Sequence, residues 1–150
     1  MVENVFFPCL AASGLYNMKN WKLFYTFNDP MGSGDSKSGI TGHPPVRWGS
    51  YQNAYSRRSH IACFDLVYIG PSRAIASLEK VIKQNNDWAI ERDGHGVTEW
   101  IKDLTAADVE KQVDEIIAGF KFKIIKVPKK FLPLTIDNYD ALVAEYNLNE

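Results

Sequence analysis

The stretch that decides the fold is LVYIGPSR, Leu66–Arg73. Its first five residues have high strand propensity and end at Gly70, and Pro71 cannot donate a backbone hydrogen bond to a neighbouring strand. Ser72 is a residue type that caps helices. The preceding run, Ile61–Asp65, continues the apolar pattern, so both faces of the extended chain are apolar except at one carboxylate. The pattern predicts a central strand, buried on both sides, that leads directly into a helix.

The predicted helix begins after its cap, Ser72, and ends near Asn85. Its apolar residues recur at the spacing that places them on one helical stripe. These residues are Ile75, Leu78, Val81 and Ile82. The helix should therefore pack this stripe against the sheet.

Two further segments predict strands, because they are apolar and alternate with period two. They are Trp21–Phe27 and Phe120–Val127, and in the second Lys121 and Lys123 face away from Phe120 and Phe122. Trp88–Gly96 predicts a short strand that ends in an Asp-Gly turn. Val97–Leu104 predicts a short helix from its i, i+3, i+4, i+7 spacing.

Two more helices follow from capping signals. Thr105 and Asp108 form the pattern of a capping box, and the helix they begin should stop at Gly119. The last helix should begin with Asp137 as its cap. The chain is therefore expected to be one α+β domain over residues 1–150, with three to four helices packed on a small mixed β-sheet.

The segment Asn28–Pro45 is rich in Gly, Ser, Asp and Pro and predicts a long flexible surface loop. Part of it, GSGDSKSG, is similar to a phosphate-binding loop. However, Ser36 stands where that motif requires Gly before Lys37, and the residues that follow do not favour a helix. The loop interpretation is therefore preferred here.

Composition restricts the class of protein. The 150 residues are 45% hydrophobic and 23% charged, which excludes a disordered chain, and the net charge of −1 provides no overall attraction to nucleic acid or anionic membranes. Cys9 and Cys63 have no metal-site spacing and indicate a reducing compartment. With Glu3 where a signal peptide carries Lys or Arg, and no apolar run of about 20 residues, we expect no membrane contact. The expected location is the cytoplasm of a cell or of a virus-infected cell.

Two basic segments are candidates for nucleic-acid binding. Arg57 and Arg58 lie near Tyr51 and Tyr55, a mixture suited to phosphate contact and base stacking. The second segment carries Lys121, Lys123, Lys126, Lys129 and Lys130. Alternating lysines also keep an edge strand soluble, so this alternative stays open.

The order of a YIG strand, a helix, a further helix, a strand and a final helix resembles the GIY-YIG nuclease domain. The resemblance implies a metal-dependent endonuclease that uses Mg²⁺, or an inactive relative that still binds DNA. It assigns Tyr68 and Gly70 to the YIG element and Glu145 to the catalytic metal ligand. The GIY element is not matched, and Leu78 stands where the family has a helix Arg, so Arg73 would have to replace it.

Three functional hypotheses follow. The first is the GIY-YIG-like nuclease or its inactive relative, with Tyr68, Arg73 and Glu145 as catalytic residues. The second is a non-catalytic protein-interaction module, such as a viral assembly component or a host-factor inhibitor, suggested by the aromatic content and the long loop. The third is a small nucleic-acid-binding module without enzymatic activity.

Overall fold

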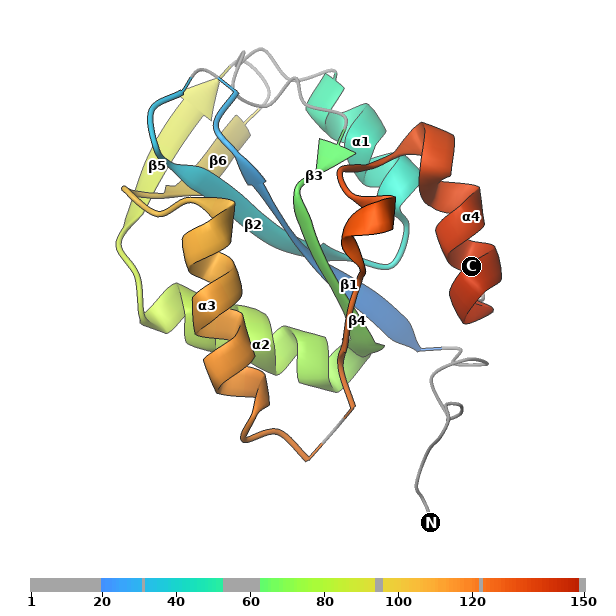
Figure 1. The fold of residues 1–150 in the computed structure, drawn as a ribbon. Coiled ribbons are helices and arrows are strands. Elements are labelled where there is room, and N and C mark those ends of the chain that lie inside the picture. Colours follow the sequence, from blue (N-terminus) through green and yellow to red (C-terminus); the bar gives the residue numbers. More distant parts are fainter. Residues whose placement is uncertain (1–19, 31, 53–62, 94–95, 122, 149–150) are drawn as a thin grey trace.

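The computed structural model describes residues 20–30, 32–52, 63–93, 96–121 and 123–148. They form one antiparallel sheet in the order β5-β6-β2-β1-β4-β7, with helices on both of its faces (Figure 1). The strands are β1 (Trp21–Asn28), β2 (Ser36–Thr41), β4 (Leu66–Pro71), β5 (Trp88–Asp93), β6 (Gly96–Ile101) and β7 (Ile125–Lys126). The helices are α1 (Pro44–Gln52), α2 (Ser72–Gln84), α3 (Ala106–Ile117) and α4 (Ile136–Tyr146).

A second sheet of two short strands, β3 (Cys63–Phe64) and β8 (Leu134–Thr135), lies beside the first, and a 3₁₀ turn, η3 (Lys129–Phe131), precedes β8. The α+β class is confirmed, and three of the four predicted helices are present as α2, α3 and α4, whereas α1 was not predicted. The sheet is antiparallel throughout the described pairings and not mixed, and two of these pairings, β1 with β2 and β5 with β6, are hairpins. None of the helices in the described part of the chain has the length and apolar character needed to span a bilayer.

Strand β1 separates two cores. Tyr25 and Phe27 point to one face, as the alternation predicted, while Phe24 points to the other. The first face is largely aromatic and is covered by α1, α4 and η3, which contribute Trp48, Tyr51, Tyr139, Leu142 and Phe131. The second face is aliphatic and is covered by α2 and α3, which contribute Ile75, Leu78, Ile82, Val109 and Val113.

Strand β4 has the central, fully buried position predicted for it. It pairs with β1 on one side and β7 on the other, and its residues from Leu66 to Gly70 are buried. Gly70 lies where a Cβ atom would come within 3.1 Å of the Ile124 side chain, so a larger residue would have to push that side chain aside. The helix follows at once, but Ser72 is its first residue and not its cap. Pro71 holds the capping position without a side-chain hydrogen bond.

The long apolar run is interrupted at Asp65. Its backbone N–H donates to Thr26 (2.9 Å), and Cys63–Phe64 pairs with β8 instead of continuing β4. Phe64 therefore packs with Val67 on the aromatic face, whereas an uninterrupted strand would place it on the same face as Leu66 and Tyr68.

The loop predicted for Asn28–Pro45 was wrong in its second half. Ser36–Thr41 forms β2 between β1 and β6, and α1 begins at Pro44. The polar residues of β2 are accommodated by the neighbouring strand: the hydroxyls of Ser38 and Thr26 lie 2.8 Å apart in a hydrogen bond. Gly39 leaves room for the Tyr25 ring, which a Cβ would meet.

Two other predictions were wrong because pairing overrides local pattern. Val97–Leu104 was expected to be a helix, but Gly96–Ile101 forms a hairpin with β5. Trp100 and Ile101 are buried on opposite faces of the sheet, as strand geometry requires. Among the described residues of the predicted strand Phe120–Val127, only Ile125–Lys126 forms a strand paired with β4, so Lys121 and Lys123 are not part of a regular strand.

Of the two caps predicted for α3 and α4, the first is confirmed and the second is wrong. The capping box of Thr105 and Asp108 is present at α3. At α4 the cap is Thr135, not Asp137: the Thr135 hydroxyl accepts from the Asp137 N–H (3.2 Å), and Asn138 accepts from the Thr135 N–H (2.8 Å).

Candidate functional site

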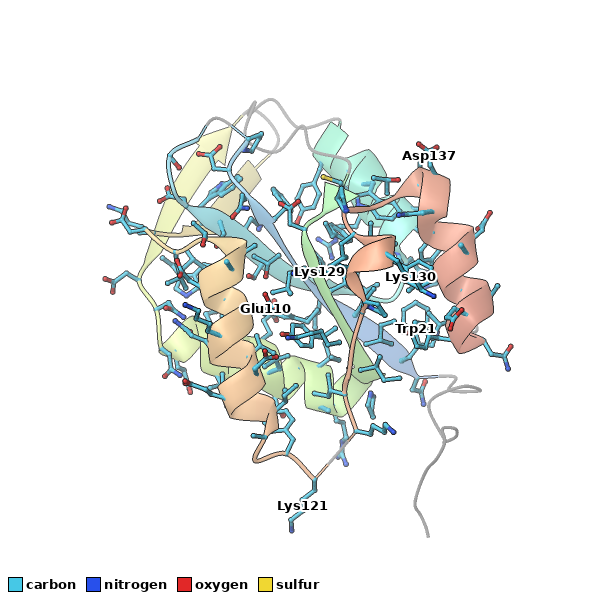
Figure 2. All side chains as sticks on the ribbon, in the orientation of Figure 1. Trp21, Glu110, Lys121, Lys129, Lys130 and Asp137 are labelled. Atoms are coloured by element: carbon cyan, nitrogen blue, oxygen red, sulfur yellow. The ribbon has the colours of Figure 1, made fainter. Side chains whose placement is uncertain are left out.

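The segment that joins α3 to α4 concentrates positive charge. Residues 119–135, called here the lysine connector, carry five of the 17 Lys and Arg residues and none of the 18 Asp and Glu residues. All five lysines are exposed. Figure 2 shows Lys121 pointing away from the body of the protein, and Lys129 and Lys130 on η3. The connector thus presents cations along most of its length.

Lys126 differs from the other lysines because two carboxylates of α3 hold it. Its Nζ lies 2.7 Å from Oδ2 of Asp114 and 2.8 Å from Oε2 of Glu110. The hydrogen bonds to Asp114 and then Glu110 raise the pKa of Lys126. Its charge is therefore largely balanced within the protein, and it fixes the connector to α3.

Tyr68 is hydrogen-bonded to the same cluster from the core of the protein. Its ring is buried on the α2/α3 face, and its hydroxyl donates to Oδ1 of Asp114 at 2.8 Å. Burial first, and then the hydrogen bond to the Asp114 carboxylate, raise the pKa of Tyr68 well above its ordinary value. The phenol is therefore protonated at neutral pH and acts as a donor, not as a base.

A pocket of about 490 Å³ lies beside this cluster. The connector provides Lys126, Val127, Lys129, Leu132 and Pro133, α3 provides Glu110, and the start of β4 provides Leu66 together with Asp65 just before it. The Asp65 carboxylate accepts from the backbone N–H of Asn28 (2.9 Å), the partner that a half-buried carboxylate requires. The pocket therefore combines apolar walls with fixed charges of both signs.

The structure does not bring the three predicted catalytic residues together. Tyr68 points to the face covered by α2 and α3, whereas α4 packs its buried residues on the opposite, aromatic face. Glu145 is exposed on α4, and Arg73 is exposed in the first turn of α2. Tyr68 and Glu145 thus lie on different sides of the sheet.

The resemblance assigns a magnesium ligand to the carboxylate of Glu145, which is exposed on α4. Within the described residues, no three Asp, Glu, His or Cys side chains are grouped so as to hold a metal ion. We derive no step through a metal. The basic pair Arg57 and Arg58 lies outside the described residues, while Lys121, Lys123 and Lys126 all belong to the connector.

Sequence reasoning missed Glu110, Asp114 and the pocket. Glu110 and Asp114 are four residues apart and so lie on one side of α3. An acidic pair at this spacing, followed by a lysine-rich segment, is a signal that could have predicted the ion pairs of Lys126 with Glu110 and Asp114.

Comparison with protein-family models, curated proteins and solved structures finds no match for this chain. The function is therefore inferred from the connector, the cluster that holds it and the pocket between them.

Proposed function

We propose that this protein binds nucleic acid through the lysine connector and does not cleave it. The observation that carries the proposal is the clustering of five exposed lysines in one segment that contains no carboxylate, although α3 balances the charge of one of them, Lys126. Lysines that neutralise phosphates release condensed counterions, which is the main source of sequence-independent affinity for nucleic acid.

The distribution of charge in the rest of the chain supports this orientation. Outside the connector, 12 Lys and Arg residues are set against 18 Asp and Glu residues, a balance of −6. A phosphate backbone is therefore repelled by most of the molecule and attracted by one segment. Such an asymmetry orients a charged partner during encounter.

The positions of the candidate catalytic residues favour binding without cleavage. The Tyr68 hydroxyl donates a hydrogen bond to Asp114, and Glu145 lies on the other side of the sheet, so the proposal does not have these two groups act on one phosphate. The GIY-YIG resemblance then concerns only the corner at which a strand leads into a helix. In this proposal Mg²⁺ is not required for binding.

The experiment compares two double variants that remove the same charge. Lys129→Ala/Lys130→Ala removes the cations of η3, and Lys80→Ala/Lys102→Ala removes two exposed lysines outside the connector. Fluorescence anisotropy with a labelled 20-nucleotide single strand at low salt should show a loss of about tenfold or more for the first variant and less than twofold for the second. Equal affinities for the two variants would exclude the connector as the contact.

A further inference from the structure

The pocket beside the lysine connector is within reach of any strand that the connector holds. Lys126 and Lys129 belong to the connector and also line the pocket. Its volume, about 490 Å³, lies within the range of pockets that enclose small ligands, roughly 300–1,000 Å³. A phosphate contact at Lys129 therefore places the attached nucleotide next to a cavity of suitable size.

The walls of the pocket fit a flat heterocycle. Leu66, Val127, Leu132 and Pro133 supply apolar surface, against which the faces of a base can pack. The carboxylates of Asp65 and Glu110 supply acceptors. Unstacked bases are recognised in this way, by packing on their faces and by hydrogen bonds along the edge that duplex pairing would use.

Both carboxylates are oriented before any ligand binds. Asp65 is held by the Asn28 N–H, and Glu110 by the Lys126 ammonium group. A carboxylate offers about four acceptor positions, so one bond of this kind leaves others for a ligand. Acceptors of fixed direction favour bases with an amino group, since adenine, cytosine and guanine donate from such groups and thymine and uracil do not.

We infer that the pocket receives one unpaired base of a single-stranded nucleic acid, with a preference for bases that carry an amino group. This inference rests on the proposed function and adds to it a preference for single strands and for certain bases. A paired base cannot enter, because its edge is occupied by its partner.

The first test measures binding of four labelled 15-mers by the full-length protein: single-stranded dA, dC and dT, and a mixed-sequence duplex. Single-stranded dC and dA should bind at least about fivefold more tightly than dT, the discrimination expected from one amino–carboxylate contact. All three single strands should bind more tightly than the duplex. Equal affinities for dC and dT, or a duplex that binds as well as dC, would overturn the inference.

The second test fills the pocket. Leu132→Trp places an indole in the wall, and Leu104→Trp is a matched control at a half-buried leucine outside the pocket and the connector. Leu132→Trp should bring single-strand affinity to the level of the duplex, whereas Leu104→Trp should keep the difference. A Leu132→Trp protein with an unchanged preference for dC over the duplex would contradict the inference.

A third variant tests the carboxylate without changing the shape of the pocket. Asp65→Asn keeps an oxygen that can accept from Asn28 but replaces one acceptor by an amide donor. The ratio of dC to dT affinity should fall to about one. Should the wild-type ratio persist, Asp65 would not read the base.

The failure of this inference can be told apart from the failure of the proposed function. If all four nucleic acids bind equally and Lys129→Ala/Lys130→Ala still weakens them all, the pocket is not a base site and the connector remains the contact. If no nucleic acid binds at low salt, both proposals fail.

Discussion

The two faces of the sheet bury tyrosine hydroxyls in different ways. On the aromatic face, the hydroxyls of Tyr25 and Tyr51 are hydrogen-bonded to each other within the core. On the aliphatic face, the Tyr68 hydroxyl donates to Asp114, and Asp114 also accepts from Lys126 at the surface. The first network lies within the aromatic core, where Arg47 also interacts with the Tyr51 hydroxyl, whereas the second connects the core to the lysine connector. The second network therefore links the core to the segment that we propose binds nucleic acid.

The largest expected effect on stability is on the aromatic face. Phe64 stacks on Tyr25, with ring centroids 4.0 Å apart, and also contacts Trp48 at 5.1 Å. Phe64→Ala should lower the free energy of unfolding by about 3–5 kcal/mol, since it leaves a cavity among aromatic rings. Urea denaturation measures this loss, and a loss below about 1.5 kcal/mol would show that this face is loosely packed.

Removing one hydroxyl from each network compares the two faces directly. Tyr51→Phe leaves the buried Tyr25 hydroxyl without this partner and should cost about 1–3 kcal/mol. Tyr68→Phe should cost about 1 kcal/mol, because Asp114 is half-buried and keeps its bond to Lys126. Urea denaturation of both variants and of wild type measures which variant loses more free energy of unfolding. A larger loss for Tyr68→Phe would reverse the comparison.

The pH dependence of stability has a defined sign. Burial raises the pKa of Tyr25, Tyr51 and Tyr68 in the folded protein, so these phenols keep protons that the unfolded chain releases above about pH 10. Their contribution is fully present below pH 10 and is lost as the pH rises toward the folded-state pKa values. The free energy of unfolding should therefore fall by up to about 1.4 kcal/mol per pH unit for each tyrosine.

Urea denaturation between pH 8 and pH 11 measures this slope. Tyr51→Phe and Tyr68→Phe should each make the decline shallower than in wild type, because each removes one of the titrating phenols. A decline of the same steepness in all three proteins would show that other groups cause it.

The sequence was informative where structure is local. The strand LVYIG, the apolar stripe of α2 and the capping box at Thr105 depend on neighbours within a few residues, and all three are present in the structure. Strand β2 was missed because its serines and glycine become a strand only through pairing with β1. Strand β6 was missed because its apolar spacing fits a helix as well as a hairpin.

The candidate site was harder to predict than the fold. The lysines were visible in the sequence, but Lys126 is neutralised by carboxylates 12 and 16 residues earlier in the chain, which only the packing of α3 brings into contact. Tyr68 and Glu145 looked compatible as a pair, since no local pattern reveals that α4 covers the face opposite to Tyr68.

The smallest expected effect concerns Glu145. Because this carboxylate is exposed on α4, away from the connector cluster, Glu145→Ala should change single-strand affinity by less than about twofold. Plasmid DNA incubated with Mg²⁺ or Mn²⁺ should remain intact with both wild type and variant. Metal-dependent cleavage that Glu145→Ala abolishes would restore the nuclease hypothesis.

The most direct test of the connector is the salt dependence of single-strand binding. The logarithm of the association constant, plotted against the logarithm of salt concentration, should fall with a slope of about −2 to −3, since each lysine–phosphate contact on a single strand contributes about −0.7. Lys129→Ala/Lys130→Ala should make the slope shallower by about 1.4, and Lys80→Ala/Lys102→Ala should leave it as in wild type. A slope near zero, or the same slope in all three proteins, would contradict the account.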